Sequence, residues 1–206
     1  MKKEIGRTSR RDFLKGLAIG AGGYALGSSL IHPREAMGQS IEANLEKASL
    51  EKRWGFASGG LVHFQVSWAK MILDTRGKEK LIEEMKIRSP QFAGGDKKFV
   101  ESLGLTASDA RSAASMIPTA ITIAYGPRQK YEIQEATPEK ARVKCLECTF
   151  WNNVQAKKIT DDLCSFHSRL YWDSFAKAIN PNLKSTMLKA KPLGDPVCEW
   201  LLELKA

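Results

Sequence analysis

The sequence predicts an α+β protein with a single domain, in which N-terminal helices precede a small antiparallel sheet with one helix packed on it. Three observations support this fold class. Apolar residues recur at helical spacing before about residue 128, they alternate with polar residues from Lys130, and no internal repeat divides the chain. About 165 residues follow position 40, which is enough for one hydrophobic core.

The helical part is expected over about residues 40–128. Helix-forming composition extends from Ile41 to about Phe56, and the apolar spacing from Leu61 to about Glu84 predicts one or two helices. The segment RSPQFAGGDKK, residues 88–98, contains Pro90 and a glycine pair, which predict a break.

Another helix is expected after this break. It should begin at Thr106 or Ser108, since either residue is a good N-cap. Pro118 should kink or end it, because proline lacks the backbone N–H that the helix needs.

The second part, about residues 129–206, is expected to contain a hairpin, a helix and a last strand. Residues 131–145 alternate around the turn-like ATPEK, which predicts a hairpin with one buried face. A helix should start at Thr160 or Asp161 and end at Pro181. The last strand should place Cys198, Trp200 and Leu202 on one face. The residues expected to be buried in the helix are Leu163, Phe166, Leu170, Phe175 and Ala178.

Residues 1–39 resemble a twin-arginine export signal. Arg10 and Arg11 lie before an apolar run from Gly16 to Ile31, and the small residues AMG at 36–38 supply a cleavage site. The run is too short and too rich in glycine for a confident membrane span. The resemblance implies the twin-arginine translocase as a partner and a periplasmic or otherwise extracytoplasmic location, with a membrane tether if the signal stays uncleaved.

The charge of the chain argues against nucleic-acid binding. Residues 1–39 hold seven Lys/Arg and three Asp/Glu, so their removal lowers the formal charge from +9 to +5. The remaining charges are mixed in sign, as in RGKEKLIEEMK at 76–86, and no basic stripe is interleaved with aromatic residues. A small-molecule ligand or substrate is the better expectation.

The C-terminal half resembles the L-2-amino-thiazoline-4-carboxylic acid hydrolase-like family over about residues 130–204. The resemblance is carried by motifs in a fixed order, among them Cys148-Thr149-Phe150, Asn180-Pro181 and the Gly194-Asp195 pair that precedes Cys198. The Gly-Asp-x-x-Cys ending is also similar to small ligand-binding domains of the vinyl-4-reductase type. The chain has Thr149 where family members have proline, and its Cys145 creates a CxxC pair.

The family resemblance implies hydrolysis of a C–N or C–S bond in a small heterocyclic or amide substrate. Cys164 would lie in the first turn of its helix, where the helix dipole favours a thiolate, with His167 on nearly the same face. Such a reaction needs a nucleophile, an acid and donors for the developing charge. The candidate catalytic residues are Cys164, His167, Asp173, Asp195 and Cys198.

The same sulfurs allow two other interpretations. Four thiolates could bind zinc or an iron–sulfur cluster in a non-catalytic accessory subunit that is exported with a redox enzyme. Disulfides are the third possibility, because they are routine outside the cytoplasm. The sequence leaves all three open. The candidate metal ligands are Cys145, Cys148, Cys164 and Cys198.

Overall fold

The computed structural model describes residues 46–205, so the predicted export signal lies outside the described residues. The chain divides into two units, Met1–Ala48 and Ser49–Ala206, and the fold below is that of the second. Within the described residues, no helix is long and apolar enough to cross a membrane. The predicted α+β class is confirmed, with helices first and an antiparallel sheet later.

Three helices form the N-terminal part: α4 (Leu50–Arg76), α5 (Lys78–Ser102) and α6 (Ala110–Tyr125). Ser49 caps α4 by accepting the backbone N–H of Lys52. Gly77 separates α4 from α5 at φ 83°, a backbone angle that favours glycine. Asp109 caps α6, one residue after Ser108 and three after Thr106, the two expected N-caps.

The prediction of a break at residues 88–98 was wrong, because α5 continues through the whole segment. Pro90 is exposed, whereas Ser89 and Ala93 lie on the buried face. Packing of that face, much of it against α8, compensates for the hydrogen bond that proline removes. Pro118 likewise lies inside α6, which ends only at Gly126.

The sheet contains four antiparallel strands in the order β1-β2-β4-β3. The predicted hairpin is confirmed as β1 (Lys130–Ala136) and β2 (Lys140–Glu147), and the predicted last strand as β4 (Cys198–Leu204). β3 (Leu183–Lys189), which the sequence did not suggest, pairs with β4 at the edge. In the register of β2 and β4, Cys145 lies opposite Cys198.

Two helices complete the fold, α7 (Thr149–Ala156) and α8 (Leu163–Ile179). The short α7 was not predicted, and its N-cap is Cys148, whose Sγ accepts the backbone N–H of Trp151. α8 is the predicted helix, capped by Asp162. Ala178 is exposed, contrary to the prediction, because it lies about 200° around the helix from the buried Ala176.

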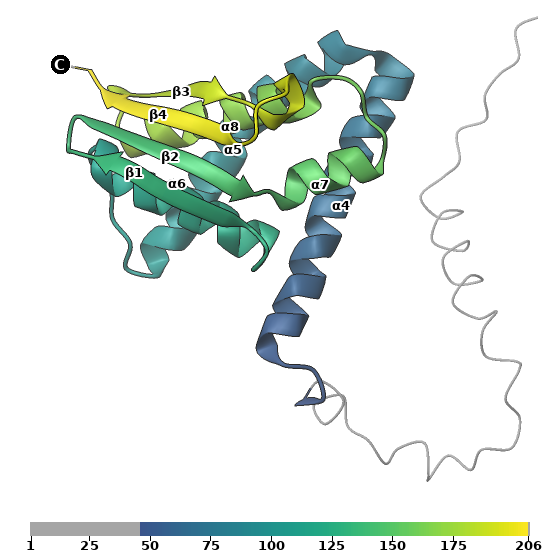
Figure 1. The fold of residues 1–206 in the computed structure, drawn as a ribbon, viewed down its shortest axis with the longest axis horizontal. Coiled ribbons are helices and arrows are strands. Elements are labelled where there is room, and N and C mark those ends of the chain that lie inside the picture. The colour runs from purple at the N-terminus through teal and green to yellow at the C-terminus, as the bar shows by residue number, and fades with distance from the viewer. Residues whose placement is uncertain (1–45, 206) are drawn as a thin grey trace, which may run out of the picture. The chain divides into compact units, whose positions relative to one another are not determined.

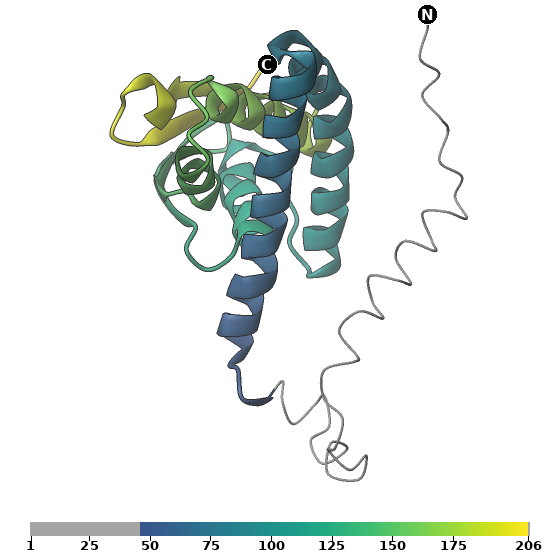
Figure 2. The same cartoon turned by 90° about the vertical axis from the view of Figure 1, so that its right-hand side faces the viewer.

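Two hydrophobic clusters form the core. Figure 1 shows α6 and α8 on one face of the sheet and α7 at the end of β2. The first cluster joins the sheet to α6 and α8, and the second joins α4 and α5 to α7 and the start of α8. α4 and α5 lie side by side (Figure 2). Tyr125 and Cys148 pack against both clusters, so the cysteines lie where the two meet.

Candidate functional site

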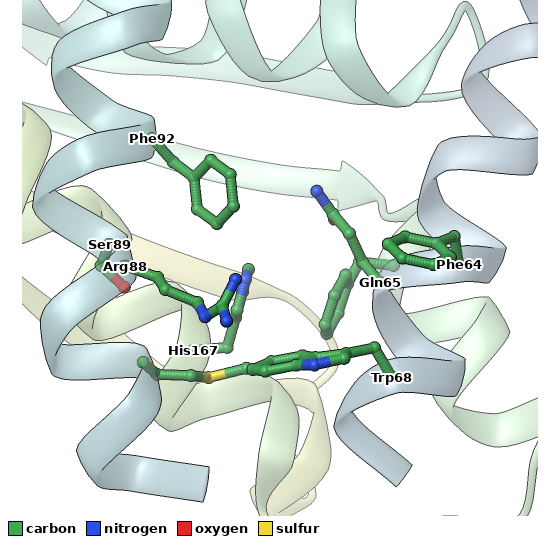
Figure 3. A pocket seen from close by; sticks show the side chains of 9 residues that line it. Phe64, Gln65, Trp68, Arg88, Ser89, Phe92 and His167 are labelled. Atoms are coloured by element: carbon green, nitrogen blue, oxygen red, sulfur yellow. The ribbon is translucent and has the colours of Figure 1, made fainter. Parts of the chain in front are cut away.

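A pocket of about 210 Å³ lies between α4 and α5. Phe150 of α7 and His167 of α8 also line it, so the pocket draws on four helices. Figure 3 shows the Arg88 and Gln65 side chains reaching into it from opposite helices. We call this the aromatic pocket; it is lined by Phe64, Gln65, Trp68, Met85, Arg88, Ser89, Phe92, Phe150 and His167.

Helical spacing places the lining residues on facing sides of α4 and α5. The residues of α4 lie at positions 64, 65 and 68, and those of α5 at 85, 88, 89 and 92. Residues three or four apart share one face of a helix, so each set forms one wall. The uninterrupted course of α5 through Pro90 is what brings Phe92 into the same wall as Arg88.

Phe150 and His167 stack where α7 meets α8. Their ring centroids are 4.5 Å apart and their planes differ by 10°. Burial lowers the pKa of His167 to about 4, so the imidazole is neutral at pH 7. A neutral imidazole can accept a proton or a hydrogen bond from a bound molecule.

The polar groups of the aromatic pocket are few. The Arg88 guanidinium carbon lies 4.9 Å from the ring centroid of Trp68, in a cation–π contact. Its Nε is 3.4 Å from a Glu84 oxygen, which is long for a hydrogen bond. Gln65 Oε1 is buried, and none of the described residues donates a hydrogen bond to it. The pocket therefore presents a cation among apolar walls, and the Gln65 acceptor is buried beside it.

A second, smaller cavity of about 30 Å³ lies between the sheet, α6 and α8. Phe150 and His167 line this cavity as well as the aromatic pocket. We call it the cysteine cavity; it is lined by Ile121, Tyr125, Gln129, Tyr131, Cys145, Cys148, Phe150, His167, Ser168, Tyr171, Trp172 and Trp200.

All four cysteines are free thiols, and Cys148 is the one that is not fully buried. The thiols of Cys145 and Cys164 hydrogen-bond to Cys148, which lowers the pKa of Cys148 well below its usual value. The same contacts, together with burial, raise the pKa of Cys145 and of Cys164. Burial also raises the pKa of Cys198. Of the four cysteines, Cys148 is therefore the one favoured as a thiolate.

The structure brings some of the predicted catalytic residues together. Cys164 lies in the first turn of α8, as expected, and its thiol contacts Cys148, which shares the cysteine cavity with His167. Asp173 instead forms an ion pair with Lys177 at 2.6 Å and lines a different groove beside β3.

Asp195 and Cys198, which were predicted to be catalytic, instead accept hydrogen bonds from the backbone of the loop before β4. Asp195 accepts the backbone N–H of Ala190 at 2.8 Å and so closes the loop before β4. Cys198 Sγ accepts the backbone N–H of Lys191 at 3.4 Å, and Cys198 is paired with Cys145 in the register of β2 and β4. Neither residue lines the aromatic pocket or the cysteine cavity.

The four-cysteine metal site gains no support from the geometry. Within residues 46–205, no group of three or more His, Cys, Asp or Glu side chains is arranged to hold a metal ion. Cys148 instead contacts the thiols of both Cys145 and Cys164.

Sequence reasoning missed the walls of the aromatic pocket. Arg88 and Phe92 fell in the segment expected to break the helix, and Trp68 was not among the candidate site residues. The spacing of residues 85, 88, 89 and 92 is itself helical and could have identified one face of α5.

Comparisons with known proteins give one informative likeness. No family model matches the chain, and no curated protein matches it. Among solved structures, the chain is similar to the phenol-responsive sensory domain of the transcription activator PoxR, solved with phenol. The TM-score is 0.54 at 11% identity, over 69% of this chain and 74% of that chain. At this identity the likeness shows a shared fold.

The depressed pKa of His167 predicts a dependence of stability on pH. The unfolded chain takes up the proton near pH 6.5 and the folded chain near pH 4, so folding stability falls as the pH drops through this window. Urea unfolding from pH 7 to pH 4 should show a shallower fall in His167→Gln than in the unchanged protein. His63→Gln, on the exposed side of α4, should keep the full fall. Equal slopes in His167→Gln and the unchanged protein would contradict the buried, neutral imidazole.

Proposed function

We propose that this protein binds a small aromatic molecule with an anionic or strongly accepting substituent in the aromatic pocket. The observation that carries the proposal is the Arg88 guanidinium lying within a cavity walled by aromatic rings. We also propose, from the N-terminal sequence, that the protein is exported and meets this ligand outside the cytoplasm.

The size of the pocket favours a single ring. An apolar cavity of about 150 Å³ accommodates benzene, and pockets for drug-sized ligands begin near 300 Å³. A volume of about 210 Å³ lies between these, so it suits one aromatic ring with a short substituent.

The polar groups select the substituent. A guanidinium binds carboxylates and other anionic oxygens with charge-assisted hydrogen bonds. Arg88 makes only a long contact with Glu84, so its other nitrogens remain oriented into the pocket (Figure 3). A benzoate-like ligand, or a phenol as its oxyanion, satisfies this group.

The likeness to the PoxR sensory domain supports this ligand class. That domain is described as phenol-responsive and was solved with phenol. The shared fold makes a small aromatic molecule a reasonable first choice for this chain, and the lining residues argue for it independently.

Replacing Arg88 tests the proposal. Benzoate should bind in isothermal titration calorimetry, and Arg88→Met should weaken it about tenfold, because the half-exposed guanidinium contributes a screened, charge-assisted bond. Arg169→Met is the matched control, since Arg169 is an exposed residue of α8 that pairs with Asp162. Absence of saturable binding by benzoate and by phenol would reject the proposal. Equal affinities in the two variants would reject the role of Arg88.

A second candidate function is hydrolysis of a C–N or C–S bond in a small heterocycle. It is favoured by the cysteine cavity, in which Cys148 has a lowered pKa and the neutral His167 is available to accept a proton. The Cys148 thiolate would attack the electrophilic carbon, and the C–N or C–S bond would break as the departing atom receives a proton from the site. Water, deprotonated by the neutral His167, would then attack the same carbon and release Cys148 as the thiolate. The nucleophile proposed here is therefore Cys148, with Cys164 as its hydrogen-bond donor.

If the protein is such a hydrolase, removal of the Cys148 sulfur should greatly lower its turnover. With 2-amino-thiazoline-4-carboxylate under reducing conditions, Cys148→Ser should lower kcat at least about 100-fold. Cys198→Ser, which lies outside the cavity lining, should retain most of the turnover. If the unchanged protein forms no N-carbamoyl cysteine, this substrate is excluded. Equal losses in both variants would remove Cys148 from the reaction.

A further inference from the structure

The four cysteines form a row at the junction of the two core clusters, joined by thiol contacts from Cys164 to Cys145 and by strand pairing from Cys145 to Cys198. Cys164 contacts Cys148, Cys148 contacts Cys145, and Cys145 lies opposite Cys198 across β2 and β4. Ligand binding in the aromatic pocket makes no use of this row, because none of the four cysteines lines that pocket.

We propose that Cys145 and Cys148 form a reversible dithiol–disulfide site, in which Cys148 is the attacking sulfur and Cys145 the resolving one. Cys148 is suited to attack because it is the one cysteine of the row that is not fully buried, and because its sulfur accepts a backbone N–H at the start of α7. Cys145 is only 1% exposed, so it can attack a disulfide formed on Cys148 from the interior of the protein.

The buried Gln129 holds the two sulfurs in place. Its Oε1 accepts the backbone N–H of Thr149 at 2.8 Å, which fixes the start of α7 next to Cys148. Its Nε2 lies 3.6 Å from Cys145 Sγ at the end of β2. The backbone N–H of Trp151 donates to Cys148 Sγ at 3.3 Å. Cys148 Sγ, which accepts this last hydrogen bond at the N-terminus of α7, is favoured as the thiolate, which is the reactive form.

The reaction is a thiol–disulfide exchange with a disulfide-bearing oxidant, such as a low-molecular-weight disulfide RSSR. The Cys148 thiolate attacks one sulfur of RSSR, which forms a mixed disulfide and releases one RS⁻. Cys145 then gives its proton to that RS⁻, and its sulfur attacks Cys148 Sγ and releases the second RS⁻. The protein pair loses two electrons, and RSSR gains them. A dithiol reductant reverses both steps.

Cys164 is the competing partner, since Cys148 can form only one S–S bond at a time. Two properties favour Cys145. Only two residues separate it from Cys148, so little loop-closure entropy opposes the bond. Gln129 contacts both Cys145 and the start of α7, whereas Cys164 belongs to the separate helix α8.

Peptide mapping of the full chain tests the pairing. Trypsin places Cys145 and Cys148 together in residues 145–157, Cys164 in 159–169 and Cys198 in 190–205. The protein is equilibrated in a series of reduced to oxidised glutathione ratios, quenched with acid, alkylated and digested. As the ratio becomes oxidising, peptide 145–157 should lose both alkyl groups and become lighter by two hydrogen atoms than its dithiol form. The other two peptides should stay alkylated, and dithiothreitol should restore the first.

Three results would overturn the proposal. The first is a peptide 145–157 that stays doubly alkylated in oxidised glutathione. The second is a cross-link from this peptide to 159–169 or to 190–205. The third is a glutathione adduct on Cys148 that persists without being resolved.

Matched variants distinguish the roles of the sulfurs. Cys148→Ser keeps a good N-cap for α7, so the fold should be retained, and the protein should form neither the internal disulfide nor the mixed disulfide. Cys145→Ser should accumulate the glutathione adduct on Cys148. Cys198→Ser should behave as the unchanged protein does. Because thiol mapping needs no ligand, failure of this proposal and failure of aromatic binding are separate results.

Discussion

The stack of Phe150 on His167 is the contact on which both cavities depend. It lies on the floor of the aromatic pocket and also borders the cysteine cavity. Offset aromatic contacts of this kind contribute about 0.5–1.5 kcal/mol beyond the area they bury. Its position follows from the start of α7, where Gln129 accepts the N–H of Thr149 and the sulfur of Cys148 caps the helix. The start of α7 therefore supplies a core contact through Phe150, a helix cap through Cys148 and the candidate reactive thiol.

Local patterns predicted much of the second half of the fold. The hairpin, α8 and β4 each have a regular apolar period with turn residues at their ends, and such signals depend little on distant contacts. The second half of α5 was missed because Pro90 and the glycine pair argue against a helix locally, while its buried face is stabilised by tertiary packing. β3 was missed because it is a short edge strand, largely half-buried or exposed, whose partner lies beyond a turn.

The site was predictable only in part, for a similar reason. Residue type and helix position brought Cys164 and His167 to attention, and both lie near Cys148 in the structure. The special role of Cys148 depends on two thiols and a backbone N–H that arrive from three elements, which the sequence does not reveal. The aromatic pocket likewise needs α4 and α5 to be placed side by side, since neither wall is a motif by itself.

A crystal structure of the protein with benzoate tests the central claim most directly, because it locates the ligand as well as detecting it. The account predicts the ring between α4 and α5, with the carboxylate on Arg88 and the ring packed against the aromatic walls. Benzoate bound elsewhere, or an aromatic pocket filled by rearranged side chains at saturating benzoate, would contradict it.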